Sequence, residues 1–167
     1  MGQHFTLDDV GRTKGDAMLK LMYKINPNSN MSFYGRLTED TYQVSRYTFS
    51  GFDNMTARKL LFDMWVDSNS YSGGIFIDGR QNAETLEVYA VTSENIDRFR
   101  ETLFDDSEIE ELPCNFKATT HTGFITSALM MSIFTNFITN QVCGDNIRVI
   151  PFKTSFNIPL MLMEQEL

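Results

Sequence analysis

The sequence predicts an α/β domain, with a three-layer, Rossmann-like sheet of mixed parallel and antiparallel strands and helices on both faces. Helix-periodic and strand-like segments alternate along the chain, which is typical of this class. An apolar fraction of 42% and 14 phenylalanines supply enough core material for 167 residues. A short aromatic run that ends at Phe52 is followed directly by a helical pattern, as in a strand–helix unit.

The first half of the chain supplies the elements of that prediction in order. Residues 8–25 predict a helix, because apolar residues recur at spacings of four. Residues 31–37 are weakly strand-like. The run that contains Tyr47, Phe49 and Phe52 predicts a buried parallel strand, and residues 55–67 give the clearest helical pattern of all.

The next segments predict an antiparallel pair and a short helix. Residues 75–78 and 85–91 are strand-like, and the short connection between them favours antiparallel pairing. Ser93 is the expected N-cap of a helix that continues to Leu103.

The last part of the chain predicts one long helix and two strands. The uncharged segment from Thr122 to Gly144 is expected to be a core helix capped by Thr122, because its many polar residues would be costly in a bilayer. Cys143 is expected to be buried. Residues 146–152 and 158–163 are strand-like.

Charge and composition exclude several classes of function. The net charge is −8, and the 14 basic residues are scattered, so we expect no nucleic-acid partner. Two cysteines are too few for a disulfide framework or a four-thiolate zinc site. No P-loop, HExxH, CxxC or Ser/His/Asp order is present, and the first residues match no leader peptide. We expect a cytoplasmic protein without a membrane partner.

Three candidate site residues follow from position, each with a structural alternative. Asp53 follows a predicted parallel strand, where it could hold Mg²⁺ against phosphates; alternatively, Asp53 or Asn54 caps the next helix. Lys14 lies near a helix N-terminus, where it could meet a phosphate or be a solvated lysine. Cys114 precedes a helix, where it could be a nucleophile or an inert cysteine.

In this order, the segments resemble the ThiF/HesA/MoeB family of adenylating enzymes, which are relatives of ubiquitin-activating enzymes. The family has Asp-x-Gly-x-x-Lys before a helix ending in Ile-Asn-Pro, and this chain has GQHFTLDDVGRTKGDAMLKLMYKINP. The family's Asp-Asn-x-x-Ala-Arg matches FDNMTAR. FIDGRQNAETLEVYAV, LPCNFKATTHTGFITSALMMSIFTNFITNQ and VIPFKTSFNIPLMLM resemble phage- and plasmid-type members. The resemblance covers nearly the whole chain.

The resemblance implies a reaction and a set of roles. Family members use ATP and Mg²⁺ to adenylate the C-terminal carboxylate of a ubiquitin-like or sulfur-carrier protein. Asp53 matches the acid that binds Mg-ATP, with Asn54 beside it, and Lys14 matches the phosphate-contacting lysine. Gln3 matches part of an Arg-Gln element whose arginine is absent, and Cys114 matches a loop cysteine that forms a thioester in some members. The family's zinc cysteines are absent.

The glycine-rich loop of the family is not found in this chain. Its Gly-x-Gly-x-x-Gly turn, with the surrounding β-α-β unit, is expected upstream of Met1. We therefore expect a single partial adenylation domain, with an ATP-site part (1–104), an acidic and cysteine loop (105–121) and a C-terminal helix with strands (122–167). Alone it is expected to be inactive, and to need the glycine-loop half or a homodimer partner. The alternative is a non-catalytic remnant that binds a ubiquitin-like protein or an intact homologue.

Overall fold

The computed structural model describes residues 6–33, 35–40, 44–69, 73–108, 120–144 and 147–167. The chain separates into two compact units, Gln3–Glu39 and a larger unit that contains Asp40–Leu167.

In the smaller unit, the helix expected over residues 8–25 is interrupted. A 3₁₀ turn, η1 (Leu7–Asp9), is followed by the helix α1 (Lys14–Ile25). Gly11 lies between them with a φ of 85°, a left-handed conformation that breaks a helix. The Thr13 hydroxyl then caps α1 by accepting a first-turn N–H at 3.1 Å. The single-helix prediction was therefore wrong at its start and correct from Lys14 onward.

The strand expected at residues 31–37 is not formed by the described residues of that segment. The segment packs instead on α1: a Cβ added at Gly15 would lie 2.2 Å from the Phe33 ring. The Tyr23 hydroxyl also donates to the Met31 carbonyl at 3.5 Å. Weak alternation did not specify a strand, because contacts with α1 hold this backbone outside any sheet.

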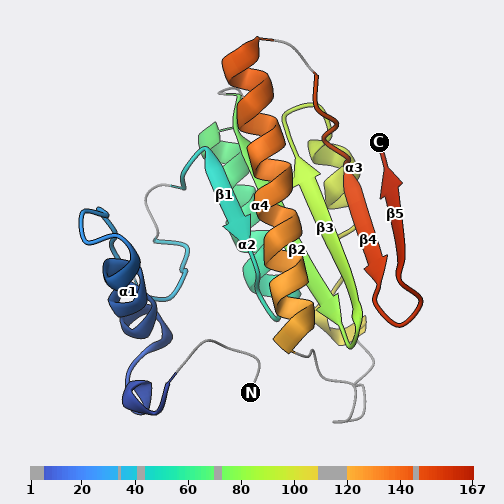
Figure 1. Cartoon of the computed structure of the whole chain (residues 1–167). Helices are drawn as coiled ribbons and strands as arrows, with labels where there is room; N and C mark the ends of the chain where they lie inside the picture. Colours follow the sequence, from blue (N-terminus) through green and yellow to red (C-terminus); the bar gives the residue numbers. More distant parts are fainter. Residues whose placement is uncertain (1–5, 34, 41–43, 70–72, 109–119, 145–146) are drawn as a thin grey trace. The chain divides into compact units, whose positions relative to one another are not determined.

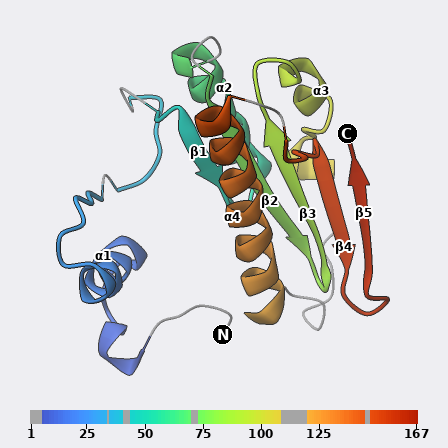
Figure 2. The same cartoon turned by 45° about the horizontal axis from the view of Figure 1, so that its top comes forward.

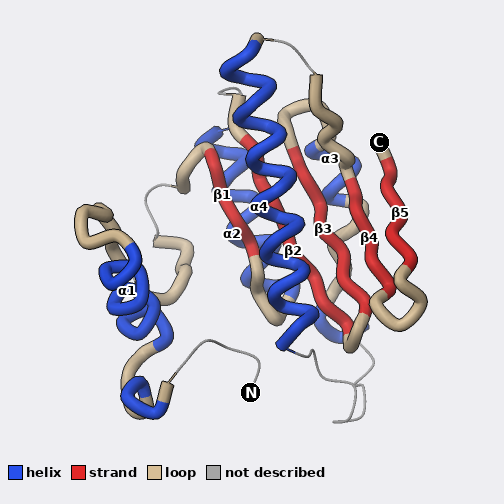
Figure 3. Tube along the Cα trace, in the orientation of Figure 1, coloured by secondary structure: helices blue, strands red, loops and turns tan. Residues whose placement is uncertain are grey.

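The larger unit is built on a five-stranded mixed sheet (Figure 3). The first two strands are parallel, with Tyr47 opposite Ile75, and the remaining neighbours are antiparallel. In spatial order the strands are β1 (Tyr47–Ser50), β2 (Ile75–Asn82), β3 (Thr85–Val91), β4 (Lys153–Asn157) and β5 (Leu162–Glu166). The predicted mixed α/β sheet is confirmed, and β1 is one of its edges.

Helices cover both faces of this sheet, as the sequence predicts. Figures 1 and 2 show α4 (Thr120–Cys143) across one face and α2 (Met55–Asn69) with α3 (Ile96–Arg100) on the other. A 3₁₀ turn, η2 (Asp106–Glu108), follows α3. The helix expected at 55–67 is confirmed.

Each face of the sheet carries its own core. The α2/α3 side is largely aromatic and contains Val44, Phe62, Trp65, Phe76, Tyr89, Val91, Phe99 and Phe152. The α4 side is mainly aliphatic and contains Ile75, Ile77, Leu86, Val88, Ala90, Met130, Ile133 and Phe137. β2 therefore contributes alternate residues to both cores, as a central strand does.

The helix α4 begins at Thr120, so Thr122 is not its N-cap. Thr122 is fully buried and lies on the inner face of the helix. That inner face is part of the core, as predicted, while Phe124 and Met131 on the outer face are 48% and 53% exposed. Among the described helices, α4 alone is long and apolar enough to cross a membrane. Cys143 is exposed rather than buried, because the last turn of α4 is exposed.

Three further element ends differ from those expected. The helix α3 begins after Asn95, not after Ser93, because the Asn95 carboxamide accepts the Thr92 N–H at 2.8 Å and closes the turn. β4 lies just beyond the predicted segment 146–152, whose Ile147 is exposed.

β5 likewise lies mostly beyond the predicted segment 158–163. A turn occupies the positions before it: Met161 has a φ of 50°, and the Leu160 N–H donates to the Asn157 side chain at 3.2 Å. Hydrophobicity alone did not reveal this turn, because the turn depends on backbone conformation and on one local hydrogen bond.

A glycine before β2 permits the parallel pair to close. A Cβ at Gly74 would lie 2.4 Å from the backbone oxygen of Arg46, whereas a Cβ at Gly51 would meet nothing within 4 Å. We expect Gly74→Ala to lower the free energy of unfolding by about 1–3 kcal/mol, as overpacking does. Urea unfolding monitored by Trp65 fluorescence measures this, with Gly51→Ala as the matched control. Equal effects of the two substitutions would contradict the steric explanation.

Candidate functional site

The candidate site lies where β1 ends and α2 begins. Asp53 and Asn54 are exposed in the turn after β1, at the carboxyl end of the parallel pair. Ligands of open α/β sheets bind beyond this end of the strands. The Asp53 carboxylate accepts a hydrogen bond from the Asn54 side chain at 3.2 Å.

The start of α2 is capped twice. The Asn54 carboxamide oxygen accepts the Ala57 N–H at 2.8 Å, which makes Asn54 the local N-cap. Asp106, about 50 residues along the chain, accepts the N–H groups of Met55 at 2.6 Å and Thr56 at 3.0 Å. Asn54 and Asp106 thus satisfy the first amides of α2, and Asp53 itself caps no described amide.

The contacts of Asp106 lower its pKa below 3.8. The Thr56 hydroxyl is the largest cause, followed by the N–H groups of Met55 and Thr56. A lowered pKa in the folded state adds stability well above pH 3.8, and this stability is lost as the pH falls through the folded-state value.

We therefore expect Asp106→Asn to lower the thermal midpoint at neutral pH. The deficit should shrink as the pH falls below 3.8, because both proteins then lack the carboxylate. Thermal unfolding followed by circular dichroism between about pH 2 and pH 7, a span that includes the ordinary carboxyl range, measures the difference. A deficit that does not change with pH would contradict a role for the ionised carboxylate.

The other predicted site residues lie elsewhere or outside the described residues. Lys14 is the first residue of α1, is exposed, and belongs to the smaller unit. Gln3 and Cys114 lie outside the described residues. The part of the chain that the structure describes holds no group of three or more His, Cys, Asp or Glu side chains placed to bind a metal.

A buried charge cluster lies behind Asp53, and sequence reasoning missed it. Asp78 on β2 is fully buried between Arg58 of α2 and Arg80, also on β2. The signals were present: Asp78 interrupts the apolar run of β2, and Arg58 ends the Asp-Asn-x-x-Ala-Arg motif. No pattern in the sequence pairs two residues that are 20 positions apart.

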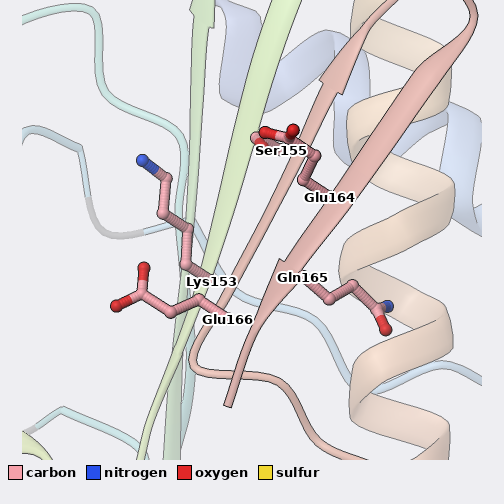
Figure 4. A pocket seen from close by; sticks show the side chains of 5 residues that line it. All are labelled: Lys153, Ser155, Glu164, Gln165 and Glu166. Carbon is pink, nitrogen blue, oxygen red and sulfur yellow. The ribbon is translucent and has the colours of Figure 1, made fainter.

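Two cavities lie away from Asp53. One, of about 540 Å³, lies on the β4–β5 hairpin and is lined by Lys153, Ser155, Glu164, Gln165 and Glu166. Figure 4 shows Lys153 and Glu166 on the same side of that hairpin and Gln165 on the other. The Lys153 ammonium lies 2.6 Å from Glu87, so its charge is already paired.

The second cavity, of about 790 Å³, lies at the amino end of β2. Its lining includes Gly74, Asn95, Arg98, Asn140 and Phe152. The Arg98 side chain donates a hydrogen bond to the Leu167 carbonyl at 2.7 Å, and the Asn140 side chain donates to the Arg148 carbonyl at 2.8 Å. These polar side chains thus bind backbone carbonyls of the residues around the second cavity, and Asp53 lines neither cavity.

Comparison with known proteins bears on the fold. Neither a protein-family model nor a curated protein matches the chain. Among solved structures, the crystal structure of selenomethionine PaaA is similar, with a TM-score of 0.58 at 15% sequence identity. The alignment covers 97% of this chain and 57% of PaaA, so the chain spans little more than half the length of that protein. At this identity the similarity shows a shared fold alone.

Proposed function

We propose that this chain is the Asp53-bearing part of a ThiF-type adenylating enzyme. The reaction would attach AMP to the C-terminal carboxylate of a ubiquitin-like or sulfur-carrier protein and release pyrophosphate. One observation carries the proposal: Asp53 is an exposed acid at the carboxyl end of a parallel strand pair, directly before a capped helix. That is the place in an α/β sheet where nucleotides bind.

The chemistry of Asp53 suits Mg²⁺ bound to ATP. Magnesium in nucleotide sites takes one or two carboxylates, with phosphate oxygens and water as the other ligands, so a single exposed carboxylate is sufficient. Bound Mg²⁺ would supply positive charge that stabilises the departing pyrophosphate. Asn54 directs its NH₂ group to Asp53 while its carbonyl caps α2, and this arrangement orients the carboxylate.

The phosphates also need donors that this chain supplies only in part. The resemblance matches Lys14, the first residue of α1, to a phosphate-contacting lysine, and a helix N-terminus favours anions. The chain contains no Gly-x-Gly-x-x-Gly sequence. The amides of such a loop would therefore come from a segment outside these 167 residues.

The edge of the sheet offers a place for that segment. Among the described residues, β1 pairs with β2 on one side alone. Phe49 on β1 is 41% exposed and packs edge-to-face on Phe134 of α4, with ring centroids 5.3 Å apart. A parallel pair is normally covered on both faces and extended by further strands, so a strand added to β1 would complete it next to Asp53.

Exchange of radiolabelled pyrophosphate into ATP tests the proposal. The chain is assayed alone, and then with the glycine-loop polypeptide of a ThiF-type enzyme and its carrier protein. We expect pyrophosphate exchange only in the completed mixture. Asp53→Ala should lower the rate by roughly 100-fold or more, because losing a metal ligand removes several kcal/mol of transition-state stabilisation. Asp67→Ala, an exposed acid in the last turns of α2, is the matched control.

Two outcomes would overturn the proposal. One is exchange that is absent in the completed mixture or unchanged by Asp53→Ala. The other is binding of the carrier protein with the same affinity whether or not Mg-ATP is present, which would favour the non-catalytic binding alternative.

A further inference from the structure

The buried charge cluster behind Asp53 has a definite geometry. One carboxylate oxygen of Asp78 lies 2.7 Å from Nε of Arg58, and the other lies 2.8 Å from Nε of Arg80. The side chains of the two arginines are 6% and 12% exposed, and that of Asp78 is fully buried. Two positive charges and one negative charge are thus held inside the unit.

A gain in stability does not by itself explain why these three charges are buried. Buried ion pairs are often no more stabilising than well-packed apolar residues of the same volume, because desolvation offsets the attraction between the charges. The second set of contacts of Arg58 supplies a reason. Its Nη2 donates to the carbonyl oxygen of Phe52 at 2.7 Å and also approaches that of Gly79 at 3.3 Å. Phe52 is the residue directly before Asp53.

The guanidinium group is planar, so its N–H donors have fixed directions relative to one another. When Nε is bound to Asp78, the direction of Nη2 is set, and with it the position of the Phe52 carbonyl. We infer that Arg58 and Asp78 are positioning residues: they fix the peptide before Asp53 and so aim its carboxylate. The effect on the reaction rests on the proposed function, and the effect on the turn does not.

Arg80 provides a matched control within the same cluster. It binds the same carboxylate, but its remaining donors go to the Thr102 carbonyl and hydroxyl, both at 2.9 Å. Its guanidinium also lies 4.3 Å from the centre of the Tyr89 ring. Loss of Arg80 removes an ion pair of Asp78 and leaves the bond from Arg58 to Phe52 in place.

The first experiment measures amide hydrogen exchange by NMR in the chain itself. We expect Arg58→Leu to raise the exchange rate of the Ala57 N–H, which Asn54 caps, by roughly tenfold or more, since a hydrogen bond from a charged donor is lost. Arg80→Leu should change that rate by less than about twofold once both rates are corrected for global stability. If Arg58→Leu does not fold, Arg58→Lys replaces it. Lysine keeps the positive charge but lacks the planar group that donates to Asp78 and to Phe52 in fixed directions.

The second experiment uses the completed enzyme and measures the Mg²⁺ concentration that gives half-maximal pyrophosphate exchange. Arg58→Lys should raise it by about tenfold, because a misplaced carboxylate binds the metal less well, and Arg80→Leu should leave it within about twofold. Equal shifts in the two variants, or no change at Ala57 in either Arg58 variant, would overturn the inference. If the wild-type mixture shows no pyrophosphate exchange, the proposed function fails, and the amide exchange rates still decide whether Arg58 positions the turn.

Discussion

Asp78→Ala is expected to lower the free energy of unfolding by about 3–5 kcal/mol, the cost of removing one partner from a buried ion pair. The substitution leaves Arg58 and Arg80 buried without the carboxylate that lies 2.7 Å and 2.8 Å from them. Each guanidinium keeps its carbonyl acceptor, at Phe52 and at Thr102, and these bonds do not neutralise two positive charges.

Urea unfolding at neutral pH, monitored by circular dichroism, measures this loss. Asp67→Ala serves as the control, because Asp67 is exposed and should stay within about 0.5 kcal/mol of the wild type. A loss below about 1 kcal/mol for Asp78→Ala would mean that water solvates both arginines in the folded protein. The ion pairs of the cluster would then be too weak to fix the position of the Asp53 turn.

Phe62→Ala is expected to lower the free energy of unfolding by about 3–5 kcal/mol, as for other buried phenylalanines. Phe62 on α2 is fully buried, and its ring centroid lies 4.6 Å from that of Phe99 and 5.2 Å from that of Phe76. The ring joins α2 to β2 and α3. A cavity at its position cannot collapse easily, because rigid aromatic side chains surround it.

The control for this prediction is Phe124→Ala on the outer face of α4. Phe124 is 48% exposed, so its removal should cost about 1 kcal/mol or less. Thermal and urea unfolding of both variants measure the contrast. Similar losses at the two positions would contradict the explanation from burial.

Local patterns in the sequence predicted most of the larger unit. The helix at 55–67 was identified by its helical period, and the strands at 75–78 and 85–91 by their short, strand-like apolar runs. The aromatic run before a helix predicted a buried parallel strand: β1 is parallel to β2, but it is only partly buried, because its Phe49 is 41% exposed. The exposed position of Asp53 at the end of β1 also agrees with its predicted place at a strand–helix junction.

Errors arose where a side-chain contact that the apolar pattern does not encode decided the local structure. The described residues of the segment 31–37 do not form a strand, since Phe33 packs on Gly15 instead. The helix N-cap expected at Ser93 lies at Asn95, whose side chain also bonds the end of β3 through the Ala90 carbonyl at 3.2 Å. A single sequence does not show such contacts, because they depend on which segments the fold brings together.

The sequence by itself determined the α/β class, the order of the main elements and the place of Asp53 between a strand and a helix. Period, turn chemistry and burial are local properties, and neighbouring residues are enough to express them. Only the tertiary structure decided what surrounds Asp53: Asp106 on the first amides of α2, and Arg58 held by Asp78 against the Phe52 carbonyl. The Asp106 and Asp78 contacts join residues 51 and 20 positions apart, so they exist only once the sheet and its helices have packed together.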